Sequence, residues 1–370
     1  MNYAAQQWAT DLAFFSLEAT KGKRVNVIAP CGYSALENAK TLRWPQFEEY
    51  FRETIPMAIP LYDAAIYHSS MYKDYEFATL HGFSNSIVIP NGVDEDEFGA
   101  SSKIDFRSKY GVRTAYVGLC VGNYYQNKGQ DRVIDAVRQM GRKDFTMVFI
   151  GREGGLLPEL RSRATGLNVK FLLDIPRADT IAAFHGADIC LFGSQIEASP
   201  LVIIEAKASR TPFVSTDCGN VREWKGGIVC SPVEMASYAN RLLDDAALRR
   251  RLAEEGYREW KEKLTWNGVV DRYEELYLSL HNKKKGLEAV PATFAENAVS
   301  RPGNKADETL LRKRLSANFR DVDALIGLAE IEMGRENRRK ARNYVIGVMA
   351  LQPENEAARV IWSRLMEGGD

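Results

Sequence analysis

The sequence lacks the features that mark a secreted, membrane-spanning or nucleic-acid-binding protein. Its 370 residues carry 49 Lys and Arg against 49 Asp and Glu, so no net charge favours a polyanionic partner. No apolar run approaches the roughly 18 residues that a transmembrane helix needs. The start has neither the basic segment nor the long apolar core of a signal peptide. We therefore expect a cytoplasmic protein that binds no nucleic acid, and peripheral contact with the inner face of a membrane stays open.

Cysteine is scarce and follows no metal-binding pattern. None of the cysteines forms a CxxC pair or stands near a histidine, and three fall in apolar, strand-like runs. Such residues are typical of reduced thiols in a core or loop rather than of zinc ligands or disulfides. We predict no metal site. The five cysteines of the chain are Cys31, Cys120, Cys190, Cys218 and Cys230.

The chain is long enough for two or three domains and a large core. Between residues 115 and 215, short apolar runs such as Ile189–Phe192 and Phe213–Ser215 alternate with helical patterns. Such alternation predicts an α/β fold with a parallel, doubly wound sheet. The glycines at 151, 154 and 155 follow a strand but do not form GxGxxG at a helix start, so they do not favour a dinucleotide site.

Two glutamates, Glu197 and Glu205, stand with seven residues between them directly after an apolar run and Gly193-Ser194. We predict Ser199 as the N-cap and Pro200 as the first residue of the helix that follows. Glu197 then lies in the loop at the carboxyl end of a strand, and Glu205 lies on the helix.

The start of this predicted helix suits an anion. The free backbone NH groups of Leu201 and Val202 lie at the positive end of the helix dipole. Hydroxyl-binding carboxylates on either side then make a plausible site for a nucleotide-diphosphate sugar. Two glutamates at this spacing also occur by chance, and Glu205 alone would be typical of a solvated helix surface, so the interpretation depends on the rest of the chain.

Four motifs in a fixed order supply that context. They are SIVIPNGVDEDEF at 86–98, VGNYYQNKGQDRVIDAV at 121–137, the glutamate pair, and STDCGNVREW at 215–224. With them, residues 4 to 280 resemble the family-4 retaining glycosyltransferases of group 1, which have the GT-B fold of two Rossmann-like domains. The resemblance implies transfer of a hexose from a nucleotide sugar to a glycan, lipid-linked or small-molecule acceptor hydroxyl with retention, without a cofactor or metal.

The resemblance also implies roles for single residues. Lys128 matches a lysine that clamps the donor diphosphate, whereas Asn123 stands where the family has an arginine. Arg132, one helical turn after Lys128, either replaces that cation or is a surface residue. The resemblance places the donor sugar at Glu197, the ribose at Glu205 and the base near Ile175. The implied catalytic residues are Lys128 and Glu197, and the implied donor-binding residues are Asn123, Ile175, Ser199, Leu201, Val202 and Glu205.

The turn at 30–34 follows a predicted strand at 24–29, where an open α/β sheet places ligand contacts. In the resembling family this turn often contains His-Gly and faces the acceptor and the donor sugar. Cys31 takes the histidine position, so no catalytic histidine is implied, and a neutral pocket-lining residue is favoured over a nucleophile. The predicted acceptor-side residues are Cys31, Gly32, Tyr33 and Ser34.

Only about ninety residues precede Asn91-Gly92, which resembles the crossing between the two GT-B domains. We therefore expect the second half of the N-terminal domain alone, with helices at 4–20, 47–52, 60–65 and 71–80 and a strand at 65–68. The predicted domains are a partial N-terminal domain at 1–95, a nucleotide-sugar-binding domain at 96–282, a linker at 283–305 and a helical tail at 306–370.

The tail carries small, large and terminating residues at the spacing of a tetratricopeptide repeat. These are Leu325, Leu328, Ala329, Ala341 and Pro353. A generic helical hairpin is the alternative. One repeat cannot bury its own face, so helices at 309–315 and 356–365 should pack on it, and the tail should bind a protein partner or cover the shortened first domain.

Two further functions compete with sugar transfer. A non-catalytic nucleotide-sugar-binding scaffold that acts through the tail is favoured by Asn123, by Cys31 and by the missing half-domain. The presence of Glu197, Glu205 and Lys128 opposes it. An isomerase or phosphorylase on the same fold is the third possibility.

Overall fold

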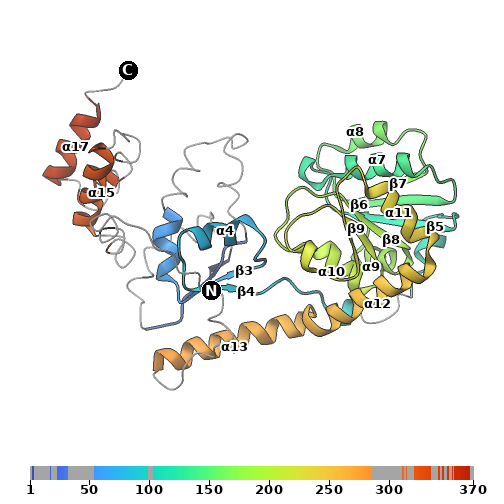
Figure 1. Ribbon diagram of the computed structural model, residues 1–370, viewed down its shortest axis with the longest axis horizontal. Helices are drawn as coiled ribbons and strands as arrows, with labels where there is room; N and C mark the ends of the chain where they lie inside the picture. Colours follow the sequence, from blue (N-terminus) through green and yellow to red (C-terminus); the bar gives the residue numbers. More distant parts are fainter. Residues whose placement is uncertain are drawn as a thin grey trace. The chain divides into compact units, whose positions relative to one another are not determined.

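The computed structural model describes residues 23–31, 54–98, 103–285, 321–334 and 354–366, together with 2–3 and single positions or pairs at 17, 311, 314, 341, 344–345, 348–349 and 352. The chain divides into two compact units (Figure 1). The first consists of Met1–Ile66, Glu76–Ile87 and Ser279–Asp370, and the second of Tyr67–Tyr75 and Val88–Leu278. The predicted division into four domains stays a prediction.

The second unit is built on a six-stranded parallel sheet with the strand order β10-β9-β8-β5-β6-β7. Its strands are β5 (Tyr116–Val121), β6 (Phe145–Gly151), β7 (Val169–Leu173), β8 (Ile189–Phe192), β9 (Phe213–Ser215) and β10 (Gly227–Val229). The predicted α/β fold with a parallel sheet is confirmed, and β8 and β9 have the predicted bounds. β10 was not predicted, because its three half-buried residues form no apolar run.

Helices cover both faces of this sheet (Figure 1). α9 (Arg177–Gly186), α10 (Leu201–Ala208) and α12 (Ala246–Lys263) share one apolar cluster with Val117 and Leu119. α7 (Gln130–Met140), α8 (Leu157–Arg163) and α11 (Met235–Asp244) share the other with Cys120. Neighbouring residues of β5 thus belong to opposite faces, as the two-residue period of a strand requires.

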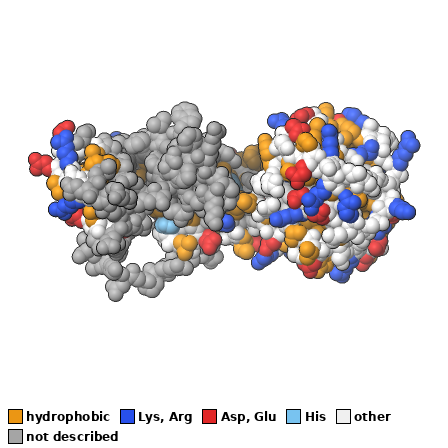
Figure 2. All heavy atoms as spheres, turned by 90° about the horizontal axis from the view of Figure 1, so that it is seen from above, with side chains coloured by type: hydrophobic (Ala, Val, Ile, Leu, Met, Phe, Trp, Pro, Cys, Tyr) orange, Lys and Arg blue, Asp and Glu red, His pale blue; other side chains and the backbone are white. Residues whose placement is uncertain are grey.

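Shorter elements complete the second unit. They are α5 (Glu95–Phe98), α6 (Phe106–Lys109) and the 3-10 turns η2 (Gln126–Lys128) and η3 (Val221–Glu223). Positive and negative side chains are interspersed over the face of this unit in Figure 2. No field of one sign forms there, in agreement with the equal numbers of acidic and basic residues.

A buried ion pair joins α10 to α12. Lys207 Nζ lies 2.6 Å from Glu259 Oε2, and the Lys207 side chain is fully buried. The same carboxylate oxygen accepts the backbone NH of Lys225 at 2.8 Å. Burial lowers the pKa of Lys207 to about 8, and the hydrogen bond to Glu259 opposes that shift. Lys207 therefore remains charged at neutral pH.

A four-stranded sheet in the order β1-β2-β3-β4 begins the chain. Its strands are β1 (Asn2–Tyr3), β2 (Val27–Ala29), β3 (Ala64–Tyr67) and β4 (Ser86–Val88), and α4 (Lys73–Leu80) precedes β4. The predicted helix at 60–65 is wrong. A 3-10 turn, η1, covers Ile59–Leu61, and β3 begins at Ala64, because Ala64–Tyr67 is fully buried in the sheet. The predicted helix at 4–20 is described only at Leu17, and the one at 47–52 lies outside the described residues.

The helix α13 (Trp266–Lys285) ends three residues beyond the predicted domain end at 282. In the tail, α15 (Val322–Gly334) and α17 (Glu356–Met366) share an apolar cluster, and α17 agrees with the predicted helix at 356–365. Four residues of the repeat pattern, Leu325, Leu328, Ala329 and Ala341, are buried in this cluster. Pro353 and most of the predicted helix at 309–315 lie outside the described residues.

Candidate functional site

The candidate site lies where the strand order of the second sheet reverses. The chain runs from β5 to β6 and β7 on one side and continues with β8 on the other. In open α/β sheets, ligands bind at the carboxyl ends of the strands at this point. The loops after β5 and β8 meet there through their backbones. Gly129 has φ of +62°, and a Cβ on it would lie 1.9 Å from the carbonyl oxygen of Gly193, so only glycine fits.

The two predicted catalytic residues are brought together across these loops. Lys128 Nζ lies 2.7 Å from Glu197 Oε1, and the hydroxyl of Ser194 donates to the same oxygen at 2.8 Å. The side chains of Lys128 and Glu197 are 29% and 17% exposed. Gln195 N donates to the carbonyl of Asn127 at 2.9 Å, which ties the loops together. One carboxylate oxygen of Glu197 is therefore occupied, and a partly accessible charge pair faces the switch point.

The start of α10 differs in one respect from the prediction. Pro200 is the N-cap and makes no side-chain cap, so the prediction of Ser199 as N-cap is wrong. The hydroxyl of Ser199 instead accepts hydrogen bonds from Asn91 N and Asn220 Nδ2, at 3.3 and 3.2 Å. Asn91 Nδ2 donates to the Ser199 carbonyl at 2.8 Å. Ser199 is buried because it joins three segments, and its predicted role in donor binding stays a prediction.

The first amides of α10 are free as predicted. Within the part of the chain that the structure describes, the backbone NH groups of Leu201 and Val202 have no acceptor, whereas those of Ile203 and Ile204 donate to Pro200. Leu201 is about half exposed. Two aligned donors thus remain at the positive end of the helix, where an anion is stabilised.

The loop after β9 supports the Glu197 loop by close backbone contact. Gly219 has φ of +54°, and a Cβ there would lie 2.5 Å from the Glu197 carbonyl oxygen and 2.4 Å from that of Ala198. Asn220 N donates to the Ala198 carbonyl at 3.3 Å. The orientation of Glu197 therefore depends on a segment about twenty residues later in the chain.

Glu205 is held by a cation that the sequence did not indicate. Arg177 Nη1 lies 2.7 Å from Glu205 Oε1, and Arg177 Nη2 lies 2.8 Å from Glu97 Oε2. The Arg177 guanidinium also lies 5.2 Å from the ring centre of Phe98. Glu205 is 9% exposed at its side chain, and burial raises the pKa of its carboxyl while Arg177 opposes the rise. Arg177 thus favours the ionised form of Glu205.

The residue at the position of the missing arginine serves the backbone. Asn123 Oδ1 accepts the backbone NH of Arg152 at 3.2 Å. Gln130 Nε2 donates to the carbonyls of Asn123 and Gly122, at 3.0 and 3.1 Å. These bonds fix the loop after β5 without adding a charge. Ile175 is partly buried against the apolar cluster of α9 and α10.

On the predicted acceptor side, the structure describes only Cys31. This residue has φ of +57°, and its Sγ contacts the Ala29 carbonyl at 3.4 Å. Gly32, Tyr33 and Ser34 lie outside the described residues. Cys120, Cys190, Cys218 and Cys230 are free, buried thiols.

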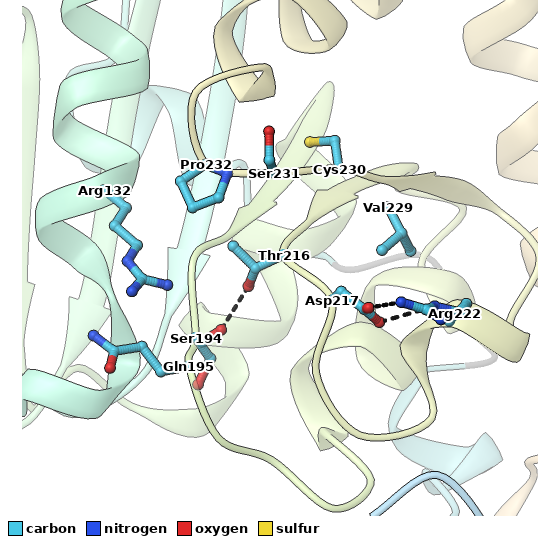
Figure 3. A pocket seen from close by; sticks show the side chains of 10 residues that line it. All are labelled: Arg132, Ser194, Gln195, Thr216, Asp217, Arg222, Val229, Cys230, Ser231 and Pro232. Carbon is cyan, nitrogen blue, oxygen red and sulfur yellow. Dashed lines mark hydrogen bonds and ion pairs between the residues drawn. The ribbon is translucent and has the colours of Figure 1, made fainter.

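A cavity of about 620 Å³ opens at the carboxyl ends of β8, β9 and β10 (Figure 3). Arg132 of α7 lines it and has no side-chain partner in the described part of the chain. Lys128 and Glu197 do not line the cavity. Whether Arg132 replaces the absent arginine stays a prediction. The lining residues are Arg132, Ser194, Gln195, Thr216, Asp217, Arg222, Val229, Cys230, Ser231 and Pro232.

The partners that orient the predicted residues were not predicted from the sequence. Ser194, Arg177 and Gln130 lie at a strand end or at a helix start, where ligand contacts gather. Their position marks these three residues as candidates for the site, but it does not predict which residue each of them contacts. Asn91 and Asn220 were quoted only as parts of motifs, and their common partner, Ser199, is 108 and 21 residues away.

Comparison with known proteins shows the fold and points to one class of enzyme. Residues 102–259 match the model of the family "Glycosyl transferases group 1". HepE from Anabaena, solved in complex with UDP and glucose, has a TM-score of 0.63 at 21% identity, over 75% of this chain and 77% of that one. Sucrose-phosphate synthase from Thermosynechococcus elongatus has a TM-score of 0.59 at 18% identity, over 70% of this chain and 68% of that one. The fold is thus that of the GT-B glycosyltransferases.

Curated relatives support the same class at the level of sequence. The D-inositol 3-phosphate glycosyltransferase of Geodermatophilus obscurus is 28% identical over 242 residues, which are 60% of this chain and 54% of that protein. A GDP-mannose-dependent alpha-(1-6)-phosphatidylinositol monomannoside mannosyltransferase of Mycolicibacterium smegmatis is 28% identical over 208 residues, 50% of this chain and 54% of that protein. The chain spans about half the length of these relatives. The comparisons support a group 1 glycosyltransferase.

No described helix has the length and apolarity to cross a bilayer. No three or more His, Cys, Asp or Glu side chains of the described segments are grouped so that they could hold a metal ion.

Proposed function

We propose that the chain transfers a hexose from a nucleotide-diphosphate sugar to an acceptor hydroxyl, with retention of the anomeric configuration. The observation that carries the proposal is the 2.7 Å pair of Lys128 and Glu197 at the switch point of the sheet, close to the uncapped start of α10. A cation and two free amides suit a diphosphate, and the free carboxylate oxygen of Glu197 suits sugar hydroxyls. The match of residues 102–259 to group 1 glycosyl transferases supports the same activity.

In the proposed mechanism the bond between the anomeric carbon and the diphosphate oxygen breaks first. Negative charge then grows on the diphosphate, and Lys128 with the amides of Leu201 and Val202 stabilises it. The acceptor oxygen bonds to the anomeric carbon on the same face, which retains the configuration, and its proton passes to the departing diphosphate. The proposal routes no step through a metal or a cofactor.

The nucleotide is placed by its ribose. Glu205 has one oxygen bonded to Arg177, and the other is available to a ribose hydroxyl. Ile175 would contact the base. Asn123 contributes no charge, so Lys128 carries more of the diphosphate binding than it would beside an arginine. We place this activity in the cytoplasm, including the inner face of a membrane, with a glycan, a lipid-linked molecule or a small molecule as acceptor.

One observation favours a second function. The side chain of Asn123 is used to fix the backbone at Arg152, so the described loop after β5 offers one cation to a diphosphate instead of two. A chain that binds a nucleotide sugar but does not cleave it would act as a scaffold through its helical tail. This scaffold is the alternative to transfer.

Calorimetric titration of the purified chain with UDP, GDP and ADP tests the donor site. One nucleotide should bind, and Lys128→Ala and Glu205→Ala should each weaken it about tenfold or more, because each removes a charged hydrogen-bond partner. Lys143→Ala is the matched control, because Lys143 is exposed and lies outside the site. If none of the three binds to the folded chain, the donor site is wrong.

Incubation with nucleotide sugars that carry the bound nucleotide distinguishes a transferase from a non-catalytic scaffold. A transferase should release free nucleotide slowly when water is the only acceptor and faster when an acceptor is added. Proton NMR of the first sugar product should show the same anomeric configuration as the donor. Lys128→Ala should slow release at saturating donor. Tight binding without release in the presence of an acceptor panel would favour the scaffold, and release of the opposite anomer would contradict retention.

A further inference from the structure

The cavity at the ends of β8, β9 and β10 is not used by the proposed donor site. None of the ten residues that line it belongs to the predicted catalytic, donor-binding or acceptor-side sets. Its volume of about 620 Å³ is within the usual range of small-molecule sites. Figure 3 shows Arg132 extending from α7 toward Ser194 and Gln195, with the loops after β9 and β10 on the other side.

The charges of the lining leave one cation uncompensated. Arg222 pairs with Asp217, so these two side chains cancel. Arg132 is half-buried and has no acceptor or carboxylate partner among the described residues. A guanidinium in a partly desolvated wall without a counter-ion favours an anionic ligand, and its planar fork matches a phosphate.

The hydroxyl groups of the lining are arranged as acceptors. Ser194 Oγ donates to Glu197, Thr216 Oγ1 donates to the Ser194 carbonyl, and Ser231 Oγ donates to Glu234. A hydroxyl has a single proton, so each of these oxygens has only lone pairs left to offer. A complementary ligand must therefore bring several O–H donors of its own.

The lining contains no aromatic side chain, so it offers no surface on which a nucleobase could stack. We propose that this cavity binds a small phosphorylated sugar or polyol, with the phosphate on Arg132 and the hydroxyl groups on Ser194, Thr216 and Ser231. This binding does not depend on the proposed transfer reaction.

The cavity shares one residue with the proposed donor site. Ser194 lines the cavity, and its hydroxyl holds Glu197 Oε1. A ligand that donates a hydrogen bond to Ser194 Oγ is thus connected through this hydroxyl to the Glu197 carboxylate, which is assigned to the donor sugar. It occupies a separate space, because Lys128, Glu205 and the α10 amides are absent from the lining.

Calorimetric titration of the whole chain with glucose 6-phosphate, glucose and inorganic phosphate tests the proposal. Glucose 6-phosphate should bind at least about tenfold more tightly than either single-feature probe, because only it supplies both the anion and the hydroxyl donors. Arg132→Ala should lose at least about tenfold of this affinity, and Arg132→Lys should lose less, since it keeps the charge. Arg161→Ala, an exposed arginine on α8 outside the cavity, should bind as wild type does.

The same samples separate this site from the donor site. The nucleotide that binds among UDP, GDP and ADP should have the same affinity for Arg132→Ala as for wild type, and at saturation it should leave glucose 6-phosphate bound. Equal affinity of wild type and Arg132→Ala for glucose 6-phosphate, or displacement of glucose 6-phosphate by that nucleotide, would overturn the proposal. The absence of glucose 6-phosphate binding to a folded chain that binds the nucleotide would also overturn it. Loss of nucleotide binding alone would count against the proposed function and leave this cavity unaffected.

Discussion

The residues of the candidate site are held by partners that stand far away in the chain. Glu205 depends on Arg177, Glu197 on Lys128 and Ser194, and Ser199 on Asn91. Each carboxylate has one oxygen engaged by the protein, which leaves the other for a ligand. The side chains of the site are therefore oriented before a ligand binds, and this lowers the entropic cost of ordering them on binding.

Arg177→Ala should make nucleotide binding more sensitive to acid. An ionised carboxylate accepts hydroxyl hydrogens more strongly than a protonated carboxyl does, and burial raises the pKa of Glu205 while Arg177 opposes the rise. Without Arg177 the pKa of Glu205 rises further, so binding weakens at a higher pH as the solution is acidified. At pH 7 we expect about tenfold weaker binding of the nucleotide that the wild type binds. Titration across pH, by calorimetry, is the measurement.

Glu97→Ala is the comparison for Arg177→Ala, because Glu97 contacts the other side of the guanidinium and is 40% exposed. An exposed partner contributes little, so nucleotide binding should change by less than about fivefold. Identical pH profiles for Arg177→Ala and wild type would show that Arg177 does not control the ionisation of Glu205.

Gly129→Ala should displace the loop that carries Lys128. Its φ is +62°, and the new Cβ would meet the backbone of Gly193, which cannot move aside like a flexible side chain. Gly141→Ala at the other end of α7 has the same backbone strain, with φ of +65°, but open space around the Cβ. The strain alone costs about 1–2 kcal/mol. Urea unfolding should show a larger loss for Gly129→Ala, and only Gly129→Ala should weaken nucleotide binding. Equal effects would argue against the close contact.

At the scale of elements, α10 has two tasks. Its first turn presents the free amides, and its second turn carries Glu205 and is anchored to α12 by the buried pair of Lys207 and Glu259. A helix of eight residues is too short to be stable alone, so tertiary contacts determine where it begins and how it is oriented.

Lys207→Met should destabilise the second unit by about 3–5 kcal/mol, because it leaves the Glu259 carboxylate buried without its cation. The double variant Lys207→Met/Glu259→Leu should recover most of that loss, since two apolar side chains of similar size replace the pair. Urea unfolding of the two single variants and the double variant gives the coupling free energy. Additive losses would show that the two side chains do not act as a pair.

At the scale of the molecule, the described apolar cores belong to different units. The clusters of the second unit cover the two faces of its sheet, and a separate cluster joins α15 and α17 in the tail. The buried repeat residues support the predicted tetratricopeptide-like arrangement, which stays a prediction, as does the incomplete N-terminal domain.

Leu328→Ala should test how independent the tail is of the nucleotide site. Leu328 is fully buried in the tail cluster, so its truncation should cost about 2–5 kcal/mol of that cluster's stability. The affinity for the bound nucleotide should stay within about twofold. Ile204→Ala, at an equally buried residue on α10, should lower both stability and nucleotide affinity. A loss of nucleotide binding in Leu328→Ala as large as that in Ile204→Ala would show that the two parts are coupled.

The α/β class, the bounds of β8 and β9, and the short set of charged residues around the switch point were predictable from the order of residues along the chain. Local periodicity and motif order carry that information, because each depends on residues that are neighbours in the chain. The tertiary structure decided which charges pair, that Ser199 is a buried junction instead of a helix cap, and that Arg132 lines a cavity. Those outcomes depend on β8 lying beside β5, which brings Glu197 to Lys128 across 69 residues. No local pattern can specify such a contact, because its energy depends on the packing of the whole sheet.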